Sequence, residues 1–255
     1  MVVHLAAITN AEGSFAIRDQ VERTNFEGTR RVAEACARAG CKMIFVSTTS
    51  VYGPQNNEVD EECTDDELKP QSPYAEAKLR AERMLEATAR TDGLRFITCR
   101  FGTIFGSSVG MRFHTAVNKF IWQASTGRPL TVWRTAMHQK RPYLELGDAV
   151  NALSFIINRS VFDNRVYNVL TTNATVSDIL DAIWLYVPEA AVEYVDSPIM
   201  NQLSYTVSNR RFCELGFRFG GSLWRSIGDA VRLFDGLSRP ERFLMNETAL
   251  ANATS

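Results

Sequence analysis

The stretch that decides the fold is CKMIFVSTTS, residues 41–50, in which an apolar run leads directly into four residues with hydroxyl groups. Short apolar runs rich in β-branched and aromatic side chains are typical of strands buried on both faces. Two further runs, VVHLAA (2–7) and LRFITCRFG (94–102), have the same character. A helical pattern over 21–40, ended by Gly40, lies between the first two strands. This alternation predicts an α/β fold with a parallel sheet that helices cover on both faces.

The ends of these strands indicate where a site would lie. Sites in open parallel sheets form beyond the carboxyl ends of the strands. This rule selects STTSVYG (47–53) after the second strand and RFGTIFG (100–106) after the third. We therefore expect functional residues near these two segments.

The second predicted helix begins in SPYAEAKLRAE, residues 72–82. Ser72 is suited to cap this helix and Pro73 to occupy its first position. Tyr74 and Lys78 then share one face, since positions i and i+4 are neighbours on a helix. An adjacent ammonium favours the phenolate of a tyrosine, whose usual pKa is about 10, and would make Tyr74 a general base. The alternative is two ordinary surface residues, because this spacing alone is a weak motif.

Composition and charge argue against several classes of protein. The chain has 255 residues, 45% of them hydrophobic, and a formal net charge of −1. It can form one large core or two small ones, and no surface for nucleic acid is expected. The apolar runs are too short to span a membrane, and the N-terminus lacks the basic start of a signal peptide. Five cysteines without a CxxC pair indicate reduced thiols in a cytoplasmic protein.

From about residue 107 the pattern loosens and the expected elements are shorter. They are helices over 114–127, 147–158, 176–186 and up to about 235, and strands over 129–133, 165–171 and near VEYV at 192–195. His114 and His138 could suggest a metal ion. No Cys, Asp or Glu stands at ligand spacing beside them, so no metal site is expected.

Seven segments together resemble a known family. VVHLAA, NFEGTRRVAEAC, FVSTTSVYG, SPYAEAK, CRFGTIFG, RPYLELGDAV and VYNVLT occur in the order found in extended short-chain dehydrogenases/reductases. Residues 1 to about 235 resemble the NAD-dependent sugar-nucleotide epimerase/dehydratase group of that family. The resemblance implies the C-terminal part of a Rossmann-type doubly wound parallel sheet with a smaller, mixed substrate-binding domain. Residues 1–106 would form the partial Rossmann domain and 107–255 the substrate-binding part, with 165–171 returning a strand to the Rossmann sheet.

The resemblance also implies catalytic and cofactor-binding residues. Tyr74 matches the catalytic tyrosine, Lys78 the lysine that lowers its pKa and binds the nicotinamide ribose, and Thr48 the hydroxyl that contacts the substrate oxygen. Residues expected to bind NAD or NADP are Ala6, Ala7, Asn25, Ser47, Tyr74, Lys78 and Phe101. Two alternatives rest on the residues themselves: Thr48 could cap a helix, and Asn25 could be a buried structural amide.

The implied substrate is a nucleotide-diphosphate sugar. The residues expected to bind it are Thr49, Thr103, Asn118, Arg141 and Tyr205. A planar guanidinium suits phosphate oxygens, which supports Arg141 in particular. The alternatives are an exposed charged loop for Arg141 and a solvated helix amide for Asn118.

The sequence departs from the family pattern in two places. Thr49 and Ser50 stand where dehydratases carry Asp-Glu, which favours epimerisation or simple oxidoreduction over dehydration. The glycine-rich turn that receives the cofactor's pyrophosphate is also expected upstream of the first strand, VVHLAA. We therefore expect that about 60 residues are missing, at ~30 residues per strand-helix-strand unit. On this expectation the chain alone would not bind NAD appreciably, and the edge of strand 2–7 would favour homo-oligomers.

Three functional hypotheses follow from the residues and the resemblance. The first is an NAD(P)-dependent epimerase or oxidoreductase of nucleotide-diphosphate sugars. The second is a non-catalytic remnant, truncated at its N-terminus, that binds nucleotide sugars. The third is one fragment of a split enzyme that needs a partner chain.

Overall fold

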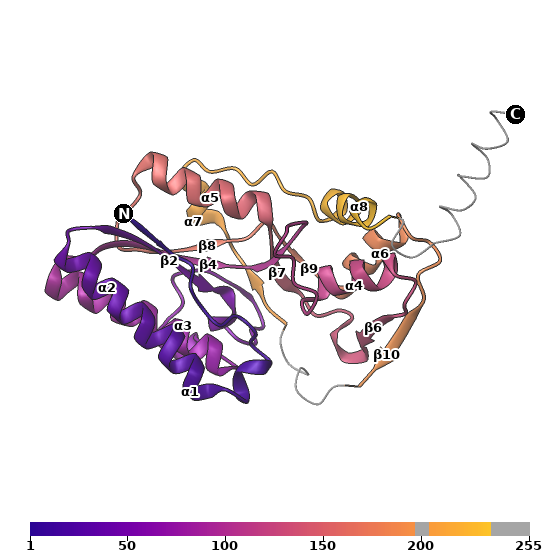
Figure 1. Cartoon of the computed structure of the whole chain (residues 1–255), viewed down its shortest axis with the longest axis horizontal. Helices are drawn as coiled ribbons and strands as arrows, with labels where there is room; N and C mark the ends of the chain where they lie inside the picture. The colour runs from indigo at the N-terminus through magenta and orange to yellow at the C-terminus, as the bar shows by residue number, and fades with distance from the viewer. Residues whose placement is uncertain (197–203, 236–255) are drawn as a thin grey trace, which may run out of the picture. The chain divides into compact units, whose positions relative to one another are not determined.

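A four-stranded parallel sheet forms the centre of the larger part of the molecule (Figure 1). The computed structural model describes residues 1–196 and 204–235. The sheet consists of β1 (Val2–His4), β2 (Lys42–Thr48), β4 (Arg95–Phe101) and β8 (Val166–Val169), in the order β1-β2-β4-β8. The predicted α/β fold with a parallel sheet is therefore confirmed. The first strand is shorter than its apolar run suggests, since it ends at His4 instead of residue 7.

Side chains of alternate residues separate onto the two faces of this sheet. On one face, β2 and β4 pack Met43 and Phe96 against α2 (Gly28–Arg38) and α3 (Pro73–Asp92). On the other face, Ile44 and Ile97 belong to a cluster that includes residues of α5 (Leu146–Arg159) and α7 (Arg210–Glu214). Figure 1 shows the two pairs of helices on opposite sides of the strands. Burial on both faces explains why the strands are almost continuously apolar.

The helix predicted over 21–40 begins earlier and contains a wide turn. It runs through α1 (Arg18–Val21), the π-helical turn η2 (Glu22–Glu27) and α2, which ends at Arg38. Gly40 follows with a φ of +61°, a conformation that glycine adopts without strain. Single π-helical turns are rare and often accompany functional residues.

The chain divides into two compact units. The first comprises Met1–Ile104, Lys140–Asn173 and the described residues 204–220, and the second comprises 105–139, 174–196 and 221–235. The expected boundary at 106 lies next to the first of these divisions. The strand expected at 165–171 is joined in the sheet-containing unit by other late segments. Helices α5 and α7 also belong to this unit and cover the second face of the sheet.

Smaller elements complete both units. The remaining strands are β3 (Glu58–Val59), β5 (Thr103–Phe105), β6 (Leu130–Trp133), β7 (Arg141–Glu145), β9 (Thr172–Ala174), β10 (Val192–Val195) and β11 (Thr206–Val207). They form a sheet of order β5-β7-β9 and the pairs β6-β10 and β3-β11. The second unit holds α4 (Ala116–Ser125), α6 (Val176–Trp184) and α8 (Leu223–Leu233), which pack on one another. Short 3-10 turns are η1 (Gly13–Phe15), η3 (Thr49–Val51), η4 (Asp65–Glu67) and η5 (Arg134–Ala136).

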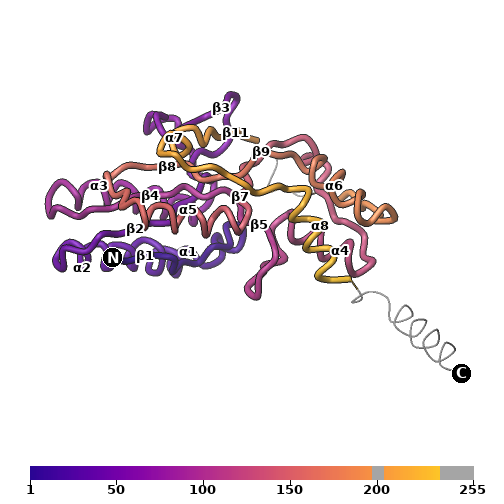
Figure 2. Tube along the Cα trace, turned by 90° about the horizontal axis from the view of Figure 1, so that it is seen from above, coloured from indigo at the N-terminus to yellow at the C-terminus, as the bar shows by residue number. Residues whose placement is uncertain are grey.

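The β3-β11 pair lies beside α7 in the first unit, as Figure 2 shows. Arg211 of α7 forms ion pairs with Glu61 and Glu62, which directly follow β3. These ion pairs hold the acidic residues that follow β3 against α7.

Within the described parts of the chain, no helix is long and apolar enough to cross a membrane. The same residues contain no group of three or more His, Cys, Asp or Glu placed to hold a metal ion. The expected cytoplasmic location stays a prediction.

Candidate active site

The first turn of α3 positions Tyr74 and Lys78. Ser72 is the N-cap, and its Oγ accepts a hydrogen bond of 3.2 Å from the backbone N–H of Ala75. Pro73 occupies the first helical position, so both parts of the predicted start are confirmed. Tyr74 is half-buried, and its backbone N–H donates to Ser14 Oγ at 3.3 Å.

Lys78 is buried at the end of β2. Only 3% of the residue is exposed, and its Nζ donates to the carbonyl oxygen of Val46 at 2.7 Å. The ammonium also lies 4.7 Å from the ring centroid of Phe45. Burial lowers the pKa of Lys78 to about 8, while the nearby Glu82 carboxylate opposes this change. An ammonium has three donors, and among the described residues Val46 is its one hydrogen-bond acceptor.

Thr48 is the last residue of β2 and is 7% exposed. Its Oγ1 accepts from the backbone N–H of Ser50 at 3.2 Å and donates to Ser50 Oγ at 3.1 Å. Thr48 therefore caps η3, as the alternative interpretation proposed. Because side chains alternate along a strand, Thr48 does not share the α3-facing side with Ser47. Convergence of the Thr48 and Tyr74 hydroxyl groups stays a prediction.

Two of the residues expected to bind the cofactor use their side chains inside the protein. Asn25 is fully buried in η2; its Oδ1 accepts from the backbone N–H of Ile8 and its Nδ2 donates to Ile8 O, both at 2.8 Å. Ser47 Oγ donates to the Glu82 carboxylate. The Asn25 amide thus fixes the segment that follows β1 and contains Ala6 and Ala7. Phe101 is 6% exposed and belongs to the core on the α5 side of the sheet.

The residues expected to bind the substrate differ in how they are used. Thr49 is buried and donates to Phe101 O at 3.3 Å, and Thr103 is the half-buried first residue of β5. Arg141, the half-buried first residue of β7, has a guanidinium without a hydrogen bond or ion pair to any described residue. It is therefore the member of this set that is best placed to bind an anion.

Asn118 and Tyr205 are buried by their own units. The Asn118 amide accepts from the backbone N–H of Gly106 at 3.4 Å and donates to Arg112 O at 3.1 Å, so it closes the preceding loop. Tyr205 is 7% exposed and packs in a hydrophobic cluster with Val51. Residues 201–203, which precede Tyr205 in the NQLSY segment, lie outside the described residues.

An ion pair between Glu82 and Arg100 escaped the sequence analysis. Arg100 Nη2 lies 2.6 Å from Glu82 Oε2, Arg100 Nε lies 3.1 Å from each carboxylate oxygen, and the two side chains are 6% and 3% exposed. The arginine in the apolar strand RFITCRF could have signalled it, because a charge buried in a strand requires a partner. The Arg100 guanidinium also stacks 4.8 Å from the ring centroid of Tyr52.

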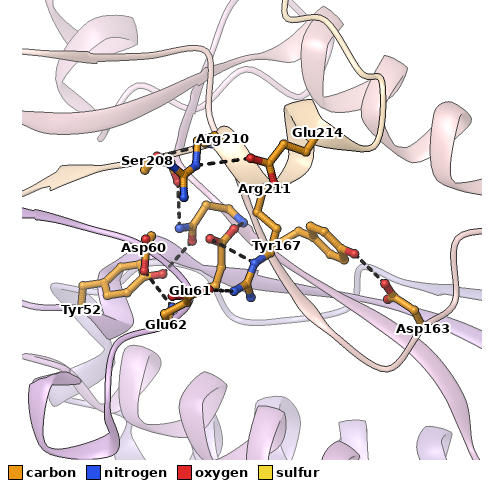
Figure 3. Close-up of polar contacts among 11 residues, drawn as sticks. Tyr52, Asp60, Glu61, Glu62, Asp163, Tyr167, Ser208, Arg210, Arg211 and Glu214 are labelled. Atoms are coloured by element: carbon orange, nitrogen blue, oxygen red, sulfur yellow. Dashed lines mark hydrogen bonds and ion pairs between the residues drawn. The ribbon is translucent and has the colours of Figure 1, made fainter.

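Polar contacts continue from Tyr52 towards α7 (Figure 3). Tyr52 OH donates to Asn168 Oδ1 at 2.9 Å, and the backbone N–H of Asn168 donates to Glu61 Oε1 at 2.5 Å. Glu61 also lies 3.9 Å from Arg211 Nε, and burial raises the pKa of this carboxyl. These contacts connect the segment after Thr48 to β8 and to α7.

A model of the NAD dependent epimerase/dehydratase family matches residues 1–169, and the chain belongs to this family. It is 28% identical over 228 residues to the trifunctional UDP-glucose 4,6-dehydratase/UDP-4-keto-6-deoxy-D-glucose 3,5-epimerase/UDP-4-keto-L-rhamnose-reductase RHM3 of Arabidopsis thaliana. That alignment covers 85% of this chain and 33% of the relative, so the chain spans about a third of its length. The dTDP-D-glucose 4,6-dehydratase of Dictyostelium discoideum is 29% identical over 67% of this chain and 41% of its own length.

Solved structures confirm the similarity of fold. MoeE5 in complex with UDP-glucuronic acid and NAD is 28% identical, with a TM-score of 0.79 over 91% of this chain and 77% of its own. A mutant of the UDP-glucuronic acid 4-epimerase of Bacillus cereus has a TM-score of 0.83 over 91% of this chain and 74% of its own, at 22% identity. Their match over most of the chain supports the Rossmann-type architecture inferred from the sequence.

Proposed function

We propose that the Thr48, Tyr74 and Lys78 site catalyses NAD- or NADP-dependent oxidation or epimerisation at a sugar carbon of a nucleotide-diphosphate sugar. The observation that carries the proposal is the buried ammonium of Lys78, one helical turn after Tyr74 and hydrogen-bonded to the end of β2. A buried ammonium with unused donors is unfavourable unless a ligand or a reaction uses it.

The side chains have complementary roles in this proposal. The positive field of Lys78 favours the phenolate of Tyr74, which takes the proton of a sugar hydroxyl. Thr48 has a rotatable hydroxyl and donates to the same sugar oxygen as it becomes a carbonyl oxygen. Its contact with Ser50 does not prevent this, because Ser50 Oγ can donate as well as accept.

The residues present fit the nicotinamide end of the cofactor. The remaining Lys78 donors suit ribose hydroxyl groups, and the segment held by Asn25 would lie along the cofactor as in the family it resembles. When bound, NAD supplies the acceptor and donor of the hydride that leaves the sugar carbon and returns to it.

The substrate class is supported by the relatives and by Arg141. MoeE5 was solved with UDP-glucuronic acid and with UDP-glucose. In this chain the Arg141 guanidinium is half-buried and makes no hydrogen bond or ion pair within the described residues, so its donors are available to diphosphate oxygens.

We favour epimerisation or oxidoreduction over dehydration. Elimination of water requires a general acid next to the site, and the residues after Thr48 are Thr49 and Ser50. Thr49 donates to Phe101 O, and Ser50 contacts Thr48. Neither has a carboxyl group that could protonate a leaving hydroxyl.

A turnover assay with matched tyrosine variants tests the proposal. The protein is incubated with NAD and either UDP-glucose or UDP-glucuronic acid, and products are followed by proton NMR. Tyr74→Phe should lower turnover by about 100- to 10,000-fold, as expected for loss of a general base. Tyr194→Phe is the control, because Tyr194 is an exposed residue of β10. Measurable turnover that is equal in wild type and Tyr74→Phe would contradict the assignment.

Binding measurements separate the alternative functions. Saturable binding of both UDP-glucose and NADH without conversion would favour a non-catalytic nucleotide-sugar-binding protein. Tight binding of NADH by the 255-residue chain would contradict the expectation that it cannot bind the cofactor alone.

We further propose that two copies of the chain associate through β1. Among the described residues β1 pairs with β2 on one side and with no strand on the other, and the following Leu5 is 60% exposed. An exposed strand edge favours pairing with an identical edge. Leu5→Lys should reduce self-association in sedimentation experiments, whereas Leu185→Lys, at a 64% exposed position elsewhere, should not. Sedimentation of the wild type as a monomer would contradict this proposal.

A further inference from the structure

The buried ion pair between Glu82 and Arg100 requires an explanation beyond stability. Moving two charges out of water is so unfavourable that apolar residues of similar size often stabilise a protein equally well. Here both side chains are almost fully buried, and the pair lies next to the proposed catalytic residues. Its location rather than its contribution to stability is the informative feature.

Glu82 contacts three elements that carry the proposed site. It lies on α3 one helical turn after Lys78. Its carboxylate accepts from Ser47 of β2, the residue before Thr48, and from Arg100 of β4. Ser47 and Arg100 are direct partners in the β2-β4 register, so one carboxylate spans both strands near their carboxyl ends.

Within the described residues, few charged groups act on Lys78. His4 of β1 and Glu82 of α3 interact with it electrostatically, and its own contacts are Val46 O and the Phe45 ring. Burial and the nearby Lys78 charge lower the pKa of His4. The negative charge that faces the ammonium is therefore that of Glu82.

We propose that Glu82 is a positioning residue of the Thr48, Tyr74 and Lys78 site, which anchors the strand end before Thr48 and holds a negative charge one turn behind the Lys78 ammonium. The effect of Glu82 on catalysis rests on the proposed function, whereas its effect on the Lys78 ammonium does not. Arg100 fixes the Glu82 carboxylate in place, since its guanidinium fork binds both oxygens. Tyr52 packs against the same guanidinium.

The test measures Lys78 directly in the full chain without cofactor. The chain has five lysines, so ¹³Cε-labelled lysine gives five resolvable NMR signals, and Lys78→Met assigns one of them. In Glu82→Gln the titration midpoint of Lys78 should fall below its wild-type value of about 8, because the opposing carboxylate is gone. Asp148→Asn is the control: Asp148 is also a buried helix carboxylate, which accepts from Thr171 Oγ1 and the Gly220 N–H.

Because Glu82→Gln leaves the buried Arg100 without its charged partner, a second variant controls for misfolding. Glu82→Gln/Arg100→Gln removes both charges and keeps hydrogen-bonding groups in place, and it should also lower the Lys78 midpoint. An unchanged midpoint in the folded variants, or the same change in Asp148→Asn, would overturn the inference.

Kinetics separate positioning from a merely structural role. If the proposed function holds, Glu82→Gln should lower kcat about 10- to 100-fold, leave KM for the sugar nucleotide within about threefold, and shift the pH profile with Lys78. A chain without turnover in which the Lys78 midpoint still depends on Glu82 would refute the proposed function and leave the positioning role intact.

Discussion

Replacing Lys78 with methionine should stabilise the protein at neutral pH, although it removes a hydrogen bond. In the folded protein burial lowers the pKa of Lys78 from 10.5 to about 8. At about 1.36 kcal/mol per tenfold change in proton affinity, keeping this ammonium charged and buried costs about 3 kcal/mol. Lys78→Met also loses the hydrogen bond to Val46 O and the contact with the Phe45 ring, and this loss offsets about 1–2 kcal/mol of the gain in stability. The net gain in the free energy of unfolding at pH 7 is then on the order of 1 kcal/mol.

The pH dependence of this difference is the sharper measurement. Between about pH 8 and 10.5 the unfolded chain holds the lysine proton that the folded protein has released. The contribution of Lys78 therefore raises the wild-type free energy of unfolding as pH rises. Lys78→Met lacks that contribution, and its advantage should shrink by about 3 kcal/mol across this range. Groups such as the half-buried Cys63 and the buried Tyr143, whose pKa values are raised, act in the opposite direction, but they are present in both proteins and cancel.

Urea unfolding at pH 7 to 10.5, for wild type and Lys78→Met in parallel, measures both quantities. Lys42→Met is the matched control, because Lys42 also lies over an aromatic ring, 5.1 Å from the Phe162 centroid, but donates to Ser160 at an exposed position. The control should show no comparable change with pH. A stability difference for Lys78→Met that stays constant over the range would refute the inference that this lysine is buried and charged.

Four further substitutions have defined outcomes. Arg141→Ala should weaken UDP binding by about 1–3 kcal/mol in calorimetry, and equal affinity would show that this arginine is a surface charge. Asn25→Ala should lower the free energy of unfolding by about 1–3 kcal/mol, because both backbone groups of Ile8 lose their partner; a neutral result would contradict the described clamp. Gly53→Ala should destabilise by more than about 2 kcal/mol, since its φ is +64° and a Cβ would lie 2.0 Å from a backbone carbonyl oxygen. Gly40→Ala, with φ +61° and open space around it, should cost only about 1 kcal/mol.

The parts of the fold that follow local rules could be predicted from the sequence. The strands ending at Thr48 and Phe101 are continuous apolar runs, and both appear with ends within two or three residues of the prediction. The start of α3 follows from Ser72 and Pro73, which are suited to these positions whatever the rest of the chain does. Such features depend on neighbouring residues alone.

Features that depend on distant parts of the chain could not be predicted. The β3-β11 pair joins two-residue strands about 150 positions apart, too short to show a periodicity. The apolar strand around Arg100 indicates that its charge needs a buried partner, but helix and strand patterns do not reveal that this partner is Glu82. Sequence patterns also do not reveal the internal partners of residues expected at the site. The Ser47 hydroxyl donates to Glu82, and the Asn118 amide binds the backbone of the preceding loop.

The π-helical turn η2 at Glu22–Glu27 fixes the number of residues in the helix that contains it. Each residue of an α-helix advances the chain by about 100°, so deleting one residue to restore regular winding would rotate everything on one side of the turn by that angle. Either the Asn25 amide would leave the Ile8 backbone, or Ala33 and Cys36 would leave the sheet that they cover. Single-residue insertions and deletions between 18 and 38 should therefore be tolerated far less well than substitutions there. The segment can vary in composition, but its number of residues is part of the geometry that holds the Ile8 backbone against the Asn25 amide.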